Sequence, residues 1–191
     1  MSGTLARAVV IGASAGAIEA LSMILPELPE SFPLPVLVVV HVPPERRNIL
    51  APLFEAKCRL ATREAEDKEA ILPGTIYFAP SDYHLLVEKG ETVALSSDEP
   101  VLHSRPAIDV LFESAADVYG EALVGVVLSG ANSDGALGLK AIVEAGGTAL
   151  IQEPAEAYAE AMPLAAVAAC PTARVMTLAA IADHLVKECA A

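Results

Sequence analysis

Tryptophan is absent from this sequence, and aromatic residues supply only 4% of its 191 positions, although 54% are hydrophobic. The core must therefore be built from valine, leucine, isoleucine and alanine. That composition is typical of an α/β protein whose parallel sheet is buried on both faces. The length suits one domain with a substantial core better than two. We therefore expect a single domain over residues 1–191.

Basic residues are also scarce, because 12 lysines and arginines stand against 25 aspartates and glutamates, which gives a net charge of -13. Neutralising nucleic-acid phosphates requires lysine and arginine, and so does binding an anionic membrane surface. The charge balance therefore predicts no nucleic-acid partner. It indicates instead an acidic, solvated surface.

Export signals and long apolar runs are missing too. No apolar run reaches the 18 residues of a membrane span, and no basic N-terminal segment leads into an apolar stretch with a cleavage site. The three cysteines, Cys58, Cys170 and Cys189, form no C-x-x-C or zinc-like pattern. We read them as reduced thiols. We expect a soluble cytoplasmic protein with no membrane insertion, metal or cofactor.

Short β-branched runs alternate with helical patterns along most of the chain, which predicts a parallel sheet with crossover helices. Strands are expected at 7–12, 36–40, 123–128, 148–151 and 174–177. Helices are expected at 17–25, 45–56, 105–119, 136–145, from about 162, and at the C-terminus to about 187. Ile18, Leu21 and Leu25 are spaced to share one buried face of the first helix, and Pro106 suits the first turn of the third.

The pattern changes between Cys58 and Pro100. Short runs at 75–78, 84–87 and 92–95 are separated by turn residues, and Lys89-Gly90 is typical of a hairpin turn. We interpret this region as an antiparallel insert at the edge of the sheet. The predicted fold class is α/β, with a single doubly wound, mostly parallel, Rossmann-like sheet carrying an antiparallel hairpin insert.

Three loops place reactive side chains after predicted strands: Ser14 after the first, His41 after the second, and Asp134 beyond the strand ending at Leu128. Active sites of open parallel sheets form outside the carboxyl ends of the strands. A hydroxyl nucleophile, a base and an orienting acid need these three residue types. Gly12-Ala13-Ser14-Ala15-Gly16 also fits the G-x-S-x-G nucleophile pattern in a strand–turn–helix context. The chain order Ser, His, Asp differs from that of α/β-hydrolases.

Each residue also has a structural explanation. Ser14 could cap the helix that follows it, His41 could bond to the backbone at a strand end, and Asp134 could cap the helix beginning at Ala136. The glycine-rich turn could instead hold a nucleotide phosphate. Against that alternative, the spacing is not G-x-G-x-x-G, and His41 stands where a dinucleotide site needs an acidic residue. None of these structural roles predicts that all three residues fall at strand ends.

Five motifs carry a resemblance to the catalytic domain of the CheB family of chemotaxis receptor methylesterases, and the match runs from about Val9 to Val186. They are Ile11-Gly12-Ala13-Ser14-Ala15-Gly16, which is similar to I-G-A-S-T-G-G; Val40-His41-Val42-Pro43-Pro44, similar to Q-H-M-P-P; the segment 72–80, similar to L-P-G-x-x-Y-x-A-P; the segment 103–112, similar to H-x-R-P-x-x-D-V-L-F; and the segment 128–135, similar to L-T-G-M-G-x-D-G.

The resemblance implies hydrolysis of glutamyl methyl esters on methyl-accepting chemotaxis receptors, and often deamidation of receptor glutamines. It places the nucleophile on Ser14, the base on His41 and the acid on Asp134. The expected oxyanion donors are backbone N–H groups near Ala15 and Gly16, with the Ala131 loop as a further candidate. No cofactor is implied.

The sequence departs from the family pattern around these residues, at Ala15, Ala17, Val40, Val42 and Ala131-Asn132. This drift keeps open an alternative in which the protein is a catalytically weak or inactive adaptor in a chemosensory pathway.

Family members commonly carry an N-terminal receiver domain, and here the first strand begins within eight residues of Met1. We therefore expect no attached receiver, which leaves a separate phosphorylated receiver protein as a candidate partner alongside the receptor's cytoplasmic helices. A basic patch from Arg46, Arg47 and Arg105 could face an acidic receptor, although ion-pair or capping roles also fit. His84 and His103 are interpreted as structural.

Overall fold

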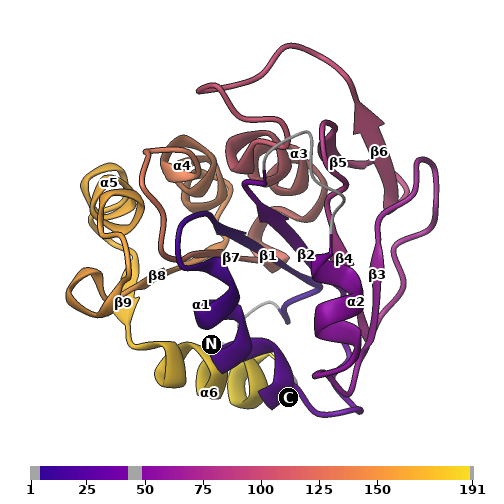
Figure 1. Cartoon of the computed structure of the whole chain (residues 1–191), viewed down its shortest axis with the longest axis horizontal. Coiled ribbons are helices and arrows are strands. Elements are labelled where there is room, and N and C mark those ends of the chain that lie inside the picture. Colours follow the sequence, from indigo (N-terminus) through magenta and orange to yellow (C-terminus); the bar gives the residue numbers. More distant parts are fainter. Residues whose placement is uncertain (1–4, 43–48, 190–191) are drawn as a thin grey trace.

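One seven-stranded parallel sheet forms the centre of the protein (Figure 1). The computed structural model describes residues 5–42 and 49–189. The strand order is β3-β4-β2-β1-β7-β8-β9, and every neighbouring pair is parallel. The strands are β1 (Ala8–Ala13), β2 (Val36–Val40), β3 (Ala61–Glu64), β4 (Thr75–Phe78), β7 (Leu123–Val127), β8 (Thr148–Gln152) and β9 (Arg174–Met176).

Helices cover both faces of this sheet (Figure 1). One face carries α1 (Ala17–Ile24), α2 (Leu50–Glu55) and α6 (Leu178–Glu188), with a 3-10 turn at Leu25–Glu27. The other carries α3 (Ile108–Tyr119), α4 (Ala136–Glu144) and α5 (Ala161–Ala169). Two further 3-10 turns lie at Gly120–Ala122 and Pro154–Glu156. Two apolar cores result, one on each side, and the doubly wound α/β class is confirmed.

The chain reverses its direction across the sheet between β1 and β7. From β1 it proceeds through α1 to β2 on one side, and from β7 through α4 to β8 on the other. The loops that follow β1 and β7 therefore diverge to opposite faces, which opens a crevice at their carboxyl ends. This is where the sequence places Ser14 and Asp134.

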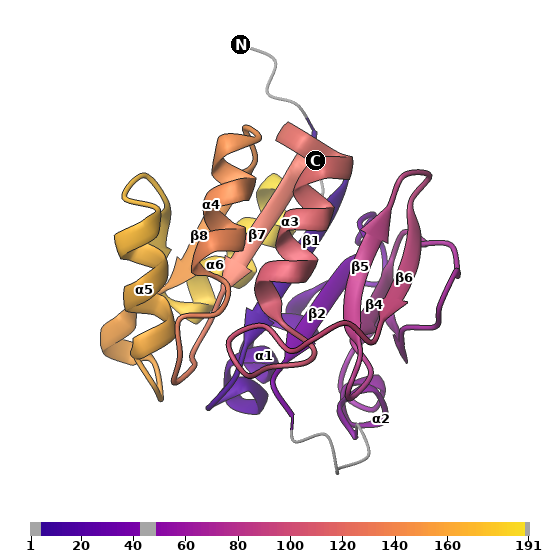
Figure 2. The ribbon, with the colours of Figure 1, turned by 90° about the horizontal axis from the view of Figure 1, so that it is seen from above.

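The region between Cys58 and Pro100 differs from the prediction. β4 is a parallel strand of the main sheet, paired with β2 and with the unpredicted edge strand β3. β3 escaped the sequence pattern because, of its four residues, only Thr62 is buried. β5 (His84–Glu88) and β6 (Thr92–Ser96) do form the expected antiparallel hairpin, but as a separate two-stranded sheet beside α3 (Figure 2).

Three helix details also differ. Ile18 is 42% exposed, because the buried stripe of α1 runs through Ala17, Ala20, Leu21 and Ile24 instead. Pro106 precedes α3, which begins at Ile108, and the Arg105–Pro106 peptide bond is cis. α2 begins at Leu50, and the predicted helical residues 45–48 lie outside the described part of the chain.

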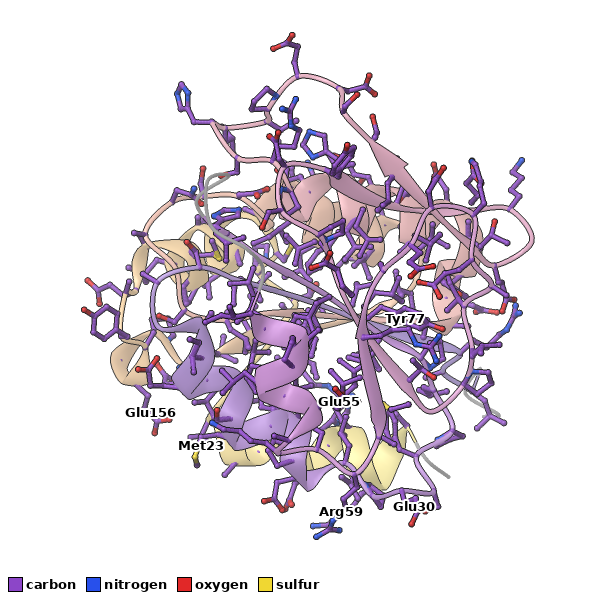
Figure 3. The ribbon with its side chains drawn as sticks, turned by 45° about the vertical axis from the view of Figure 1, so that its right-hand side comes forward. Met23, Glu30, Glu55, Arg59, Tyr77 and Glu156 are labelled. Carbon is purple, nitrogen blue, oxygen red and sulfur yellow. The ribbon has the colours of Figure 1, made fainter. Side chains whose placement is uncertain are left out.

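The surface is charged and the interior is apolar. Side chains such as Glu30, Arg59 and Glu156 extend outward from the rim of the molecule (Figure 3). Across residues 5–42 and 49–189, none of the helices combines the length and apolarity needed to cross a bilayer.

The N-terminus of α3 lies tightly against the end of β1. A Cβ atom added to Gly12 would lie 2.3 Å from Cγ2 of Ile108, the first residue of α3. Only glycine allows this approach. The glycine thus brings the start of α3 to the carboxyl edge of the sheet, next to the turn that carries Ser14.

Two buried carboxylates cap each other's helices. Asp134, in the loop before α4, accepts hydrogen bonds from the amides of Ile108 and Asp109 at the start of α3, at 2.6 and 2.9 Å. Asp109 in turn accepts from Gly135 and Gly138 at the start of α4, at 2.9 and 2.7 Å. Neither helix has a side-chain cap from its own N-cap residue. The exchange satisfies amides that would otherwise be unpaired at both helix starts.

Asp109 carries an electrostatic penalty in this arrangement. It is 4% exposed, and the pKa of its carboxyl is raised from 3.8 to about 6, chiefly because burial disfavours the charged form. Within that net shift, the hydrogen bonds from Gly138 and Gly135 lower the pKa, and the negative charges of Asp134 and Glu113 raise it. Burial outweighs the two bonds, so ionisation of Asp109 opposes folding.

Replacing Asp109 with asparagine should therefore change how stability depends on pH. Below about pH 4 the carboxyl is protonated in both the folded and the unfolded chain. Between about pH 4 and pH 6 the carboxyl ionises in the unfolded chain but stays largely protonated in the folded one, so the free energy of unfolding falls as the pH rises. Asparagine keeps an oxygen acceptor and does not ionise. Relative to the unsubstituted protein, Asp109→Asn should gain on the order of 2 kcal/mol in free energy of unfolding between about pH 4 and pH 7, measured by urea denaturation.

Asp117→Asn is the matched control, because Asp117 lies exposed on the same helix. Its stability should follow that of the unsubstituted protein across this pH range. Parallel curves for Asp109→Asn and the unsubstituted protein would contradict the penalty assigned to Asp109.

Candidate active site

Ser14 lies directly beyond β1, in the tight turn that leads into α1. Its amide donates to the carbonyl oxygen of Ser129 at 2.9 Å, which joins the loops that follow β1 and β7. The N-cap of α1 is Gly16, with a φ of 80° and no side-chain cap bond. Ser14 does not cap the helix with its hydroxyl, so its structural explanation is not supported by the geometry.

His41 is placed beside Ser14 by the register of two neighbouring strands. Ala13 of β1 pairs with Val40 of β2, so the residues that follow, Ser14 and His41, are next to each other at the same edge. The His41 amide donates to the Ala13 carbonyl at 3.2 Å, which continues the ladder by one residue. Adjacent strands lie about 4.8 Å apart. The parallel pairing of β1 and β2 therefore makes Ser14 and His41 neighbours.

Asp134 reaches the same place from the far side of β1. Its Oδ2 lies 2.7 Å from Nε2 of His41, whose side chain is 12% exposed, while the Asp134 side chain is fully buried. The other two partners of this carboxylate are backbone N–H donors, an arrangement that suits an ionised acceptor. We therefore assign the proton of the neutral imidazole to Nε2, which leaves Nδ1 as its basic nitrogen.

His41 lies between two pockets. The first has a volume of about 200 Å³ and is also lined by Ser14 and by an apolar wall that includes Ile18 and Leu50. The second has a volume of about 360 Å³, and Arg105 and His103 are among its lining residues. Within the described part of the chain, no hydrogen bond joins the Ser14 hydroxyl to His41. Such contacts often tighten only when substrate binds.

Two backbone amides next to Ser14 are available as donors. The amides of Ala15 and Gly16 have no hydrogen-bond acceptor among the described residues. They precede α1, whose dipole favours negative charge at this end. The structure thus provides a candidate site for an oxyanion beside the Ser14 hydroxyl. Ala131 is exposed in the neighbouring loop.

Arg105, which the sequence offered as part of a basic patch or for an ion-pair or capping role, forms an ion pair. Its guanidinium bonds to Asp82 at 2.6 and 3.0 Å and to the carbonyl oxygens of Ser97 and Asp98 at 2.9 and 3.1 Å. The guanidinium of Arg105 thus holds the loop that follows β6. Arg46 and Arg47 lie outside the described residues.

His84 and His103 lie in different settings. His84 is 2% exposed, its Nδ1 accepts from the Ala107 amide at 3.1 Å, and its Nε2 lies 3.0 Å from the Glu99 carbonyl oxygen. It therefore supports the start of α3. His103 is exposed, with a φ of 65°, and lines the larger pocket.

Sequence reasoning gave no role to three residues that support the site. Asp109 and Ser129 stand within motifs that were noticed, and Gln152 ends β8. Ser129 and Gln152 are 1% and 2% exposed, and the Gln152 side chain accepts from the Ser129 amide at 2.9 Å. Their positions, just beyond β7 and at the end of β8, were a usable signal. Their partners could not be identified from it.

No disulfide joins the three cysteines, which are present as thiols. Burial raises the pKa of Cys58 to about 11, which disfavours the reactive thiolate, and also raises that of Cys170. Within the described ranges, no cluster of three or more histidine, cysteine or acidic side chains is arranged to hold a metal ion.

Comparisons with known proteins agree on one family. The family model described as CheB methylesterase matches residues 9–185. A Leptospira interrogans protein, provisionally named a protein-glutamate methylesterase/protein-glutamine glutaminase, is 46% identical over 95% of this chain and 94% of its own length. Protein-glutamate methylesterase/protein-glutamine glutaminase 1 of Carboxydothermus hydrogenoformans is 40% identical over 93% of this chain, which spans only 54% of that protein.

The fold gives the same result. The crystal structure of the Thermotoga maritima CheB methylesterase catalytic domain matches with a TM-score of 0.91 and 32% sequence identity, over 95% of this chain and 98% of that domain. The family model, the relatives and the structure all cover nearly the whole chain. This chain belongs to the CheB methylesterase family.

Proposed function

We propose that this protein is a cytoplasmic protein-glutamate methylesterase, and a protein-glutamine glutaminase, that acts on methyl-accepting chemotaxis receptors through Ser14, His41 and Asp134. The observation that carries the proposal is the 2.7 Å bond between His41 and Asp134 on the strand end adjacent to Ser14. The names of the relatives supply the substrate class.

In the first half-reaction, Nδ1 of His41 takes the proton of the Ser14 hydroxyl as the oxygen attacks the ester carbonyl carbon. Asp134 holds the imidazole by Nε2 and stabilises its positive charge. The imidazolium then returns the proton to the departing methoxy oxygen. Methanol leaves, and the glutamyl group stays bound to Ser14 as an ester.

In the second half-reaction, water gives a proton to the same nitrogen and adds to the acyl carbon. The bond to the Ser14 oxygen breaks, the proton returns to that oxygen, and glutamate is released. The amides of Ala15 and Gly16 stabilise the negative oxygen in both halves. With a glutamine side chain, ammonia leaves in place of methanol and the rest of the sequence is unchanged.

The receptor is the proposed macromolecular partner, as an amphipathic helical surface that presents a modified glutamate. Long-range repulsion between a chain of charge -13 and an acidic receptor slows their encounter. A separate phosphorylated receiver protein is the proposed regulator.

Ser14→Ala should abolish the release of methanol from methylated receptor, because no other described hydroxyl occupies the nucleophile position. The fold should be unaffected, since the contact that fixes Ser14 uses its amide. Methanol release and thermal unfolding test both statements. Ser133→Ala, at an exposed serine in the loop before α4, is the control.

Retained turnover in Ser14→Ala would refute the nucleophile. A Ser14 that a fluorophosphonate does not label in the unsubstituted protein would favour the adaptor alternative.

Asp134→Asn should lower kcat by roughly 10⁴, the loss that this change causes in another serine hydrolase triad, with a much smaller effect on KM. The asparagine side chain has one carbonyl oxygen, which cannot match the bonds that two carboxylate oxygens accept from Ile108, Asp109 and His41. Steady-state kinetics and thermal unfolding together separate the catalytic effect from loss of the α3 cap. A kcat within tenfold of the unsubstituted enzyme would contradict the role of Asp134.

A further inference from the structure

Ser129 contacts the chain on both sides of the Ser14 side chain. It follows β7, the strand that neighbours β1, and it is 1% exposed. Its carbonyl oxygen accepts from the Ser14 amide at 2.9 Å. Its hydroxyl lies 2.6 Å from the Ala15 carbonyl oxygen. One buried residue thus holds the peptide group before Ser14 and the peptide group that follows Ala15.

The second contact fixes the direction of a candidate oxyanion donor. The Ala15 carbonyl and the Gly16 N–H belong to one planar trans peptide group, so they point in opposite directions. A hydrogen bond that holds the carbonyl toward Ser129 therefore directs the N–H away from Ser129. This N–H has no acceptor among the described residues.

Ser129 is itself held by its surroundings. The Gln152 side chain accepts from its amide at 2.9 Å, and its hydroxyl accepts from the Ala159 amide at 2.9 Å. The Ala159 carbonyl lies 3.3 Å from the same hydroxyl, farther than the Ala15 carbonyl, so the single hydroxyl proton goes to Ala15. Every hydrogen-bonding atom of Ser129 is therefore used.

Other residues pack closely against Gly16. A Cβ atom added to Gly16 would lie 3.0 Å from the Ser129 hydroxyl and 2.5 Å from Cβ of Tyr158. The loop that carries Tyr158 and Ala159 therefore lies next to the turn and to Ser129. The Ser129 hydroxyl is the polar group between the turn and this loop.

We propose that Ser129 is a positioning residue that orients the Ala15–Gly16 peptide group so that the Gly16 N–H meets the oxyanion formed at Ser14. This inference rests on the proposed function and adds a residue to which that function gives no role. Removing the hydroxyl should leave substrate binding largely unchanged and slow the chemical steps, because the donor acts on charge that develops in the transition state.

The test compares Ser129→Ala, Ser129→Thr and Ser133→Ala. Threonine keeps the hydroxyl and stands at this position in the family pattern, whereas Ser133 is exposed in the same loop. Two measurements are made on each variant: kcat and KM for methylated receptor, and the rate constant for labelling of Ser14 by a fluorophosphonate. Labelling also develops charge on an oxygen, and its rate constant reports only on folded molecules.

In Ser129→Ala, kcat and the labelling rate constant should both fall by roughly 10- to 100-fold, with KM changed by less than about threefold. Ser129→Thr should restore both to within about threefold of the unsubstituted enzyme, and Ser133→Ala should match it. If Ser129→Ala does not fold, the test rests on Ser129→Thr, which retains the hydroxyl. A roughly 10- to 100-fold fall of kcat and of the labelling rate constant in Ser129→Thr would then overturn the inference.

Other outcomes would overturn the inference or the function it rests on. An unchanged labelling rate in Ser129→Ala, or an effect on KM alone, refutes the positioning role while leaving Ser14 as the nucleophile. Failure of the unsubstituted protein to label at Ser14 refutes the proposed function itself.

Discussion

The exchange of carboxylate caps between α3 and α4 is the interaction on which the site depends. Asp134 satisfies the amides of Ile108 and Asp109 at the start of α3, and Asp109 satisfies those at the start of α4. The exchange holds the loop between β7 and α4 against α3. Because His41 bonds to the same Asp134 oxygen as Ile108, the orientation of its imidazole follows from the position of α3. Helix packing and the geometry of the candidate site therefore share one buried group.

The sheet supplies the other half of the site through its register. Ser14 and His41 need no special contact to become neighbours, since each is the residue that follows a paired position of two parallel strands. Ser129 follows β7 in the same way and bonds to the turn around Ser14. β1 lies between β2 and β7. The candidate base, His41, follows β2, and Ser129, which contacts the turn around Ser14, follows β7.

Sequence reasoning identified these elements where the signal was local. The apolar runs of β1, β2, β7 and β8 predicted the sheet, and the strand-end positions of Ser14, His41 and Asp134 predicted where they would gather. β3 was missed because its side chains are mostly exposed, and β4 was assigned to the insert because no local pattern states which strand is its partner. The roles of Asp109 and Ser129 depend on contacts 26 and 114 positions away in the chain. A motif shows that such a residue is present but not which amide or carbonyl it contacts.

Burying two carboxylates side by side opposes folding, and the pKa of Asp109 records that penalty. Asparagine could accept the same bonds from Gly135 and Gly138 without a charge, so hydrogen bonding alone does not explain an aspartate there. In the proposed mechanism the charge of Asp134 has a use, because a nearby anion stabilises a developing imidazolium on His41. Asp109 is in direct contact with that anion, because its amide donates to Asp134 at 2.9 Å. The electrostatic penalty in the fold and the proposed stabilisation of positive charge on His41 therefore both involve the charge of Asp134.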